Sequence, residues 1–252
     1  MAWQAAVSAL LLLLLLLLLL WLFLSNRRPL FPLDDRVQIA PKRIDVLVNN
    51  AGVVAGRPLL ELSPAQIRKT FAVNTLAHFW MVRAVLPSMK KDDTRDAMIV
   101  SVSSVMGFTS STGLSDYCAS KAATNAFHES LRLELQRDRV THIRTLLVCP
   151  SGVDTGMFDG AFQGDSWSFK LTRALIPLLE EQDVVDCIFS AILGGKKLLI
   201  YCSSGWRGFV FPWMLPVSRL LPVSVYDLVM SLAGGLHGMD SFVGRAKKQK
   251  QR

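Results

Sequence analysis

Short apolar runs alternate with longer helical segments along this chain of 252 residues, and the alternation restricts the fold more than any other feature. Three apolar runs have the length of a buried strand and end in a turn, at residues 44–52, 96–107 and 143–158. Two segments between them, residues 63–91 and 117–137, are typical of helices, and Pro64 after Ser63 suits a capped first turn. This order predicts a parallel sheet with right-handed crossovers, in which ligands bind beyond the carboxyl ends of the strands.

Tyr117 and Lys121 lie four residues apart, so on a helix they share one face. A tyrosine titrates near ~10 by itself, and we expect the nearby cation to lower its pKa, so that it can exchange a proton with an alcohol. Ser104 would hold the substrate oxygen, and Asn74 could anchor a water molecule that relays protons from the lysine. The same Tyr-x-x-x-Lys spacing also occurs on solvated helix surfaces. The interpretation of this pair as catalytic therefore needs support from other segments.

Four segments resemble the motifs of the short-chain dehydrogenase/reductase family, in order, from about residue 44 to residue 158. The run NNAG matches the family's motif at the end of a strand, and four residues match its catalytic tetrad: Asn74, Ser104, Tyr117 and Lys121. The turn PSGVDT matches the stretch that holds the nicotinamide, although Ser151 stands where many members have glycine. The resemblance implies that the cofactor contacts Asn50, Ala51, Gly52, Tyr117, Lys121, Pro150, Val153 and Thr155.

The resemblance implies a Rossmann-like α/β fold, with a doubly wound parallel sheet, that binds NAD or NADP. The residues in these motifs, together with the apolar N-terminus, resemble those of the branch that contains membrane-bound retinol and 17β-hydroxysteroid dehydrogenases. The implied function is the interconversion of a lipophilic alcohol and its carbonyl, of the retinoid or steroid class. The helices over residues 63–91 and 117–137 resemble the family's dimer-forming pair, which allows a homodimer.

The segment before residue 44 departs from the family. Members begin with a strand and a Gly-rich turn whose backbone amides hold the pyrophosphate of the dinucleotide. Here residues 25–43 contain no glycine and are rich in proline and charge. We therefore expect a sheet truncated in its N-terminal half, with an open edge at the strand of residues 44–48. The alternative function is a non-catalytic form that cannot bind the dinucleotide and acts by pairing with an intact enzyme.

The N-terminus is strongly apolar, because residues 5–24 carry no charge and residues 10–20 are consecutive leucines. Twenty apolar residues at ~1.5 Å each span a ~30 Å hydrocarbon core. We expect residues 1–28 to form an uncleaved anchor, either spanning or hairpin, followed by a linker over residues 29–43. A cleaved signal peptide is the alternative, although a basic n-region is lacking. Arg27 and Arg28 place the catalytic domain in the cytoplasm, and the resemblance implies the endoplasmic reticulum membrane or a lipid droplet.

Residues 44–204 make up the expected catalytic domain, with a helix over residues 183–193 and a last strand over residues 197–202. Residues 205–243 are apolar and broken by Pro212, Pro216 and Pro222, which favours short helices on a bilayer or at a substrate entry, or else packing on the sheet.

The formal charge of +8 is partly concentrated in the tail of residues 244–252. The basic residues of the tail are not interleaved with aromatic residues, so the tail favours membrane lipid over nucleic acid as a partner, and a solvated tail is the alternative.

The four cysteines lack close pairing, which indicates reduced thiols. The histidines lack the spacing of metal ligands, so no metal site is expected.

Overall fold

The computed structural model describes residues 44–161, 170, 174, 177–195, 198–202 and 205–243. The predicted anchor, linker and basic tail lie outside the described residues. So does most of the segment between residues 161 and 177.

The described residues form a sheet of four parallel strands in the order β1-β2-β3-β4. The strands are β1 (Val46–Asn49), β2 (Ala97–Val102), β3 (Ile143–Pro150) and β4 (Leu198–Tyr201). The predicted parallel sheet is therefore confirmed, and each strand falls within its predicted segment. In the described part of the chain, β1 has β2 as its single hydrogen-bonded neighbour.

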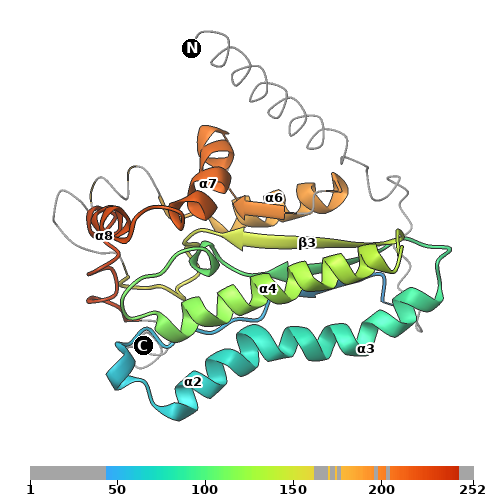
Figure 1. Cartoon of the computed structure of the whole chain (residues 1–252), viewed down its shortest axis with the longest axis horizontal. Helices are drawn as coiled ribbons and strands as arrows, with labels where there is room; N and C mark the ends of the chain where they lie inside the picture. Colours follow the sequence, from blue (N-terminus) through green and yellow to red (C-terminus); the bar gives the residue numbers. More distant parts are fainter. Residues whose placement is uncertain are drawn as a thin grey trace, which may run out of the picture.

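Helices cover both faces of the sheet, as a doubly wound fold requires (Figure 1). On one face lie α2 (Pro64–Phe71), α3 (Ala77–Lys91) and α4 (Ser115–Arg137), and on the other lies α6 (Glu181–Leu193). Alternate residues of β2 point to opposite faces, so Ile99 packs with α3 and α4 whereas Met98 packs with α6. The burial of both faces explains why the strands read as continuous apolar runs.

The first helical segment begins and ends as predicted but is not regular throughout. The Ser63 side chain caps α2 by accepting a bond from the Gln66 N–H, and the Gln66 side chain accepts one from the Ser63 N–H, at 3.2 Å and 2.9 Å. Between α2 and α3, the turn η2 (Ala72–Leu76) is a π-helix. The predicted single helix therefore contains one wide turn, a feature that often marks functional sites.

Two short helices, α7 (Gly205–Ser218) and α8 (Val223–Leu232), follow β4, as the prolines predicted. Pro222 precedes the first residue of α8, but α7 continues through Pro212 and Pro216 instead of ending there. Among the helices described here, none combines the length and the apolar character that crossing a bilayer requires.

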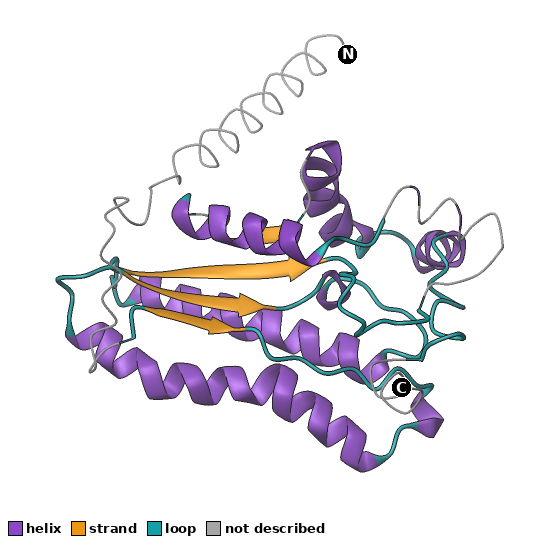
Figure 2. Cartoon of the chain, turned by 180° about the vertical axis from the view of Figure 1, so that it is seen from behind, coloured by secondary structure: helices purple, strands orange, loops and turns teal. Residues whose placement is uncertain are grey.

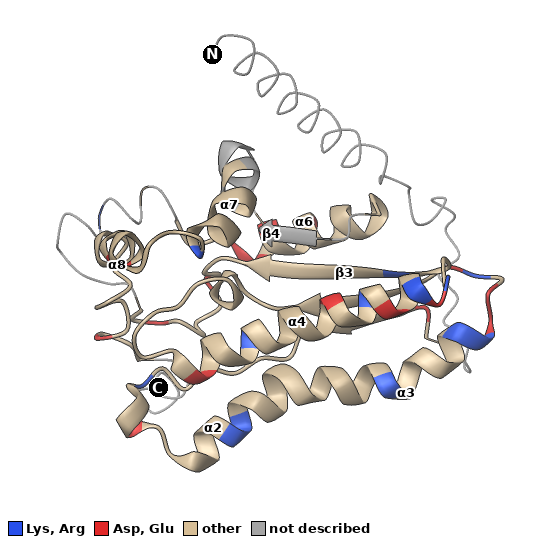
Figure 3. Ribbon diagram, viewed as in Figure 1, with Lys and Arg blue, Asp and Glu red and all other residues tan. Residues whose placement is uncertain are grey.

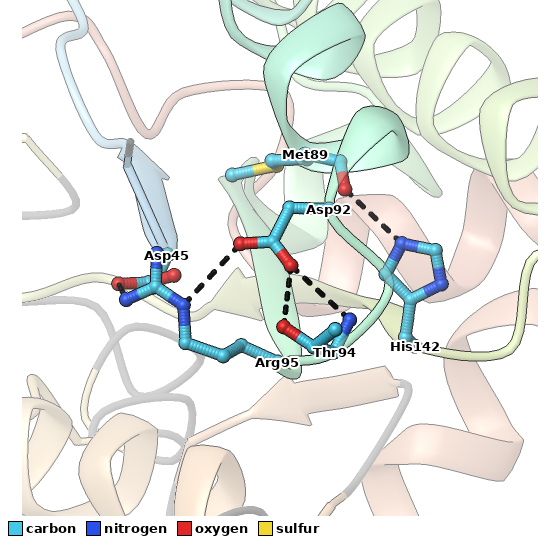
Figure 4. A network of polar contacts seen from close by, with 6 residues as sticks. All are labelled: Asp45, Met89, Asp92, Thr94, Arg95 and His142. Atoms are coloured by element: carbon cyan, nitrogen blue, oxygen red, sulfur yellow. Dashed lines mark hydrogen bonds and ion pairs between the residues drawn. The ribbon is translucent and has the colours of Figure 1, made fainter. Parts of the chain in front are cut away.

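The strands run in the same direction, so their carboxyl ends meet at the end of the sheet where the long loops gather (Figure 2). The opposite end is joined by a polar network in which Arg95 forms ion pairs with Asp45 and Asp92, and His142 contacts the carbonyl of Met89 (Figure 4). This network ties the starts of β1 and β3 to the end of α3, and it leaves the carboxyl end free for chemistry.

The cap of α2 should be measurable as stability. Ser63→Ala removes the acceptor for the Gln66 N–H, so we expect the free energy of unfolding to fall by about 1 kcal/mol in chemical denaturation. Ser63→Asp, which keeps an acceptor at the cap, should retain most of the stability. Equal losses in both variants would contradict the capping role.

Candidate active site

The predicted site residues come together at the carboxyl end of the sheet, although they come from different elements. Ser104 follows β2, Tyr117 and Lys121 lie in the first half of α4, and Asn74 lies in η2. A Cβ atom on Gly52, in the turn after β1, would lie 3.7 Å from both Lys121 Nζ and Asn74 Oδ1. The NNAG turn therefore lies against the lysine and the asparagine.

Tyr117 is almost fully buried, and its ring meets that of Phe158 edge-on, with the centroids 5.6 Å apart. Burial raises the pKa of Tyr117 to about 12, while a side-chain hydrogen bond with Ser104 lowers it in part. The predicted direction, a pKa lowered by Lys121, was therefore wrong for this state of the protein. The cost of removing a phenolate from water outweighs the favourable contacts around it.

Lys121 is itself buried, close to the Tyr117 ring. Its Nζ donates a hydrogen bond to the carbonyl of Val102, at 3.0 Å, and lies 5.8 Å from the centre of the Tyr117 ring. Burial lowers the pKa of Lys121 to about 8, against a smaller opposite effect of Cys149. The lysine can thus exist with or without its extra proton close to neutral pH, so its charge is less firmly fixed than that of an exposed lysine.

Asn74 fixes the loop after β1. Its Oδ1 accepts from the Val53 N–H at 2.8 Å, and its Nδ2 donates to the Val53 carbonyl at 2.9 Å and to Ser120 Oγ at 3.0 Å. The main-chain carbonyl of Asn74 accepts from Thr124 Oγ1 at 2.7 Å. These contacts commit both amide protons, so the side chain acts here as a clamp between η2, α4 and the NNAG turn. The predicted relay water remains a prediction.

Sequence reasoning missed Ser120 and Thr124, which hold Asn74 from the side of α4. Both lie on the helix that carries Tyr117, three and seven residues further along, and a helix brings these spacings to one face. That periodicity could have found them. The π-turn that brings Asn74 to this face has no comparable signal in the local residues.

The turn after β3 is tied to the segment before α6. Val153 forms an isolated parallel bridge with Leu179, whose N–H donates to the carbonyl of Gly152 at 2.8 Å. Pro150 is buried at the end of β3, whereas Val153 and Thr155 are half-buried. Asn50 and Ala51 in the NNAG turn are exposed, so a ligand could contact both turns without displacing the core.

The two-sided parallel sheet, with Ser104, Tyr117 and Lys121 at its carboxyl end, defines the class of Rossmann-like α/β proteins. The profile of the short chain dehydrogenase family matches residues 33–166, more than half of the chain. The chain therefore belongs to the short-chain dehydrogenase family and is an oxidoreductase of that family.

Named relatives agree with this assignment. Human epidermal retinol dehydrogenase 2 is 34% identical over 224 residues, which are 89% of this chain and 68% of that protein. Human estradiol 17-beta-dehydrogenase 11 is 34% identical over 198 residues, or 79% of this chain and 60% of that protein. Rat retinol dehydrogenase 10 is 44% identical over 137 residues, covering 54% and 40%.

Solved structures share the fold. A short chain dehydrogenase from Burkholderia cenocepacia, in complex with NADP, superposes with a TM-score of 0.55 at 24% identity, covering 77% of this chain and 70% of that one. A 4-hydroxyisoleucine dehydrogenase complexed with NADH and succinate gives 0.51 at 24% identity, covering 63% and 67%.

The clamp role of Asn74 predicts a large loss of stability on its removal. Asn74→Ala leaves the N–H and carbonyl of Val53 without their partner, so the free energy of unfolding should fall by about 2–4 kcal/mol. Asn50→Ala, at an exposed position in the NNAG turn, should stay within about 0.5 kcal/mol of the parent. Similar losses for the two variants, measured by thermal or chemical unfolding, would argue against the clamp.

Proposed function

We propose that this protein is a membrane-anchored, NAD- or NADP-dependent oxidoreductase that interconverts a lipophilic alcohol and its carbonyl. The observation that carries the proposal is the contact between Ser104 and the buried hydroxyl of Tyr117, with Lys121 on the same face of α4. The names of the retinol and estradiol dehydrogenases among its relatives support a retinoid or steroid as the substrate class.

In this proposal Ser104 orients the substrate oxygen and Tyr117 moves the proton. Because the pKa of Tyr117 is about 12, its hydroxyl is protonated at neutral pH and is ready to donate to a carbonyl oxygen. Oxidation of an alcohol needs the phenolate, and a positive charge on Lys121 would stabilise that form. A bound nicotinamide supplies or accepts the hydride at the substrate carbon.

The residues at the carboxyl end of the sheet fit the nicotinamide half of a dinucleotide. Lys121 Nζ carries three donors and makes one hydrogen bond to the described residues, with Val102, so it could also hold the nicotinamide ribose. The exposed backbone of Asn50 and Ala51, with the close approach at Gly52, would border the cofactor. Val153 and Thr155 would contact the carboxamide. Solved relatives of this fold bind NADP in one case and NADH in another, so either dinucleotide suits the proposal.

A second candidate is a non-catalytic form that pairs with an intact enzyme, or with a second copy, through α3 and α4. It is favoured by large apolar side chains that are exposed on these helices, namely Phe79, Trp80, Met81 and Leu133, and by Leu76 at the end of η2. It is also favoured by the position of β1, whose described neighbour lies on one side alone and whose Val48 is about half exposed, at 48%. An open parallel edge is a site for further strand pairing.

We further propose that α7 and α8 lie on the lipid surface and that residues 1–28 anchor the chain there. Exposed apolar side chains run along both helices and the turn between them, where Lys, Arg, Asp and Glu are sparse (Figure 3). The basic residues 244–252 come after residues 233–243, and they would add attraction to anionic lipid. This arrangement matches an endoplasmic reticulum or lipid-droplet protein whose catalytic domain faces the cytoplasm.

The lipid-facing helices are also joined to the loop after Ser104. The Tyr226 hydroxyl of α8 lies 2.8 Å from Thr109 Oγ1, and Arg219 donates to the carbonyl of Phe108 at 2.8 Å and to Ser110 Oγ at 2.9 Å. A substrate dissolved in the bilayer would therefore meet the protein beside its site.

Dinucleotide binding separates the two candidates. Purified protein in detergent, titrated with NADH and NADPH while nicotinamide fluorescence is followed, should show saturable binding if it is an enzyme. Tyr117→Phe should abolish turnover and leave binding largely intact, because it removes the proton-carrying hydroxyl alone. Tyr226→Phe, which removes a phenol hydroxyl on α8, should retain turnover. Binding without loss of turnover in Tyr117→Phe would reject the assigned role, and absence of binding would favour the non-catalytic form.

The lipid surface can be tested by depth-dependent quenching in the full chain. A fluorophore attached at Leu220→Cys, where the native side chain is 83% exposed, should be quenched by spin-labelled lipids in proteoliposomes. The matched label at Glu134→Cys, exposed on α4, should not be quenched. Equal quenching at the two positions, or none at Leu220, would contradict the proposal.

A further inference from the structure

A polar layer separates the apolar core from the active site, and it begins on the helices. On α3, the buried side chains that face the sheet are apolar at Met89, Val85 and Val82, and the next one toward the site is His78. On α4, Leu135 and Leu131 belong to the same apolar cluster, and the next buried side chain toward the site on that face is His128.

The strands also change from apolar to polar side chains as they approach the site. Leu47 of β1 and Ile99 of β2 belong to the apolar cluster with α3 and α4. Two residues further along, on the same faces, stand Asn49 and Ser101, which are paired in register. Because all four elements run into the site, these two residues and the two histidines form one layer directly behind it.

The polar atoms of this layer are buried and unpaired. Within the described part of the chain, six of them have no hydrogen-bond partner: Asn49 Nδ2, Ser101 Oγ, and both ring nitrogens of His78 and His128. The exposed fractions are 8% for Asn49, 2% for His78 and zero for Ser101 and His128. Each orphaned polar atom costs about 1–3 kcal/mol, so a folded protein does not leave six of them dry in one layer.

The layer is coupled to the catalytic lysine. Burial lowers the pKa of His78 to about 4, and electrostatic interactions with Lys121 and, to a smaller extent, with His128 lower it further. Burial likewise lowers the pKa of His128 to about 4, with a smaller opposite effect of Glu129 and a further lowering by Arg132. Both imidazoles are therefore neutral at neutral pH, and each offers one donor and one acceptor.

We propose that Asn49, Ser101, His78 and His128 hold a layer of ordered water molecules that solvates Lys121 from the side of the core. The two histidines are thereby positioning residues for Lys121. Buried water molecules commonly satisfy polar atoms that lack protein partners, and this layer offers the several donors and acceptors that each needs. The inference deepens the proposed function, since it assigns a support to the lysine of that site.

The solvation matters because Lys121 carries a charge in the interior. An ammonium group without solvation or an ion partner would lose its proton, which would remove the cation that a Tyr117 phenolate requires. Water molecules and neutral imidazoles can reorient when the lysine gains or loses a proton, whereas apolar side chains cannot. The polar layer thus keeps both forms of Lys121 accessible.

The test is the pKa of Lys121, followed by NMR of ¹³C-labelled lysine in the detergent-solubilised full chain and assigned by loss of the signal in Lys121→Arg. Replacing both histidines, His78→Met with His128→Met, should lower this pKa by about one pH unit, because hydration of the ammonium is lost. The pair His78→Gln and His128→Gln, which keeps donors and acceptors, should restore most of it.

The sign of the change separates this role from others. Charged histidines would repel the ammonium, so their removal would raise the pKa of Lys121. A purely structural role would leave it unchanged. Either result would overturn the proposal. Val82→Ala, one helical turn from His78 and buried in the apolar cluster, is the matched control, and it should lower stability without moving the pKa.

A second measurement covers the case in which the double variant does not fold. In the unsubstituted protein, magnetisation should transfer directly between bound water and both imidazole rings, and a dry layer without such transfer would refute the proposal. Neither measurement uses a dinucleotide. If the cofactor titration fails while the pKa of Lys121 responds to the histidines, the water layer stands and the proposed enzymatic function falls.

Discussion

The burial of Lys121 against the carboxyl end of β2 is the constraint on which the rest of the site depends. Its ammonium, carried on α4, donates a hydrogen bond to the Val102 carbonyl at the end of β2, and this contact joins the helix to the strand. Tyr117 then lies one turn earlier on α4, beside Ser104. Burying the charge of this lysine costs free energy. The surrounding polar groups can lower that cost, which a lysine on the surface would not require.

Burial also sets the proton chemistry, and it does so against the simple electrostatic expectation. In water, a nearby ammonium would lower the pKa of a phenol, and a nearby phenolate would raise the pKa of an ammonium. Here desolvation moves the pKa of Tyr117 up and that of Lys121 down, toward the neutral form of each. Tyr117 therefore keeps its proton at neutral pH and can donate it to an oxygen, whereas Lys121 loses its extra proton more readily than an exposed lysine would. The charge of a bound ligand would shift the pKa values of Tyr117 and Lys121 further.

Two supports hold the site, and they differ in kind. Asn74 clamps the NNAG turn with direct hydrogen bonds, and its place depends on the wide turn of η2. The layer of His78 and His128 lies behind Lys121 and acts, in our proposal, through water. The exposed helices α7 and α8 contact the loop after Ser104, so the proposed lipid surface and the site are neighbours in the fold.

Local sequence patterns determined the elements and the identities of the reactive groups. Apolar runs with turns at their ends gave the strands, Ser63 and Pro64 gave the start of α2, and the spacing of Tyr117 and Lys121 gave their common helix face. Such features depend on neighbours within a few residues, because the periods of helix and strand are local properties of the backbone.

Only the tertiary structure decided the rest. The π-turn at Asn74, the passage of α7 through its prolines, the raised pKa of Tyr117 and the alignment of His78 with His128 depend on contacts between segments far apart in the chain. Burial, in particular, is a property of the packed molecule, and it reversed the predicted shift in the pKa of Tyr117 because the cost of desolvation exceeded the opposite effect of the hydrogen bond with Ser104.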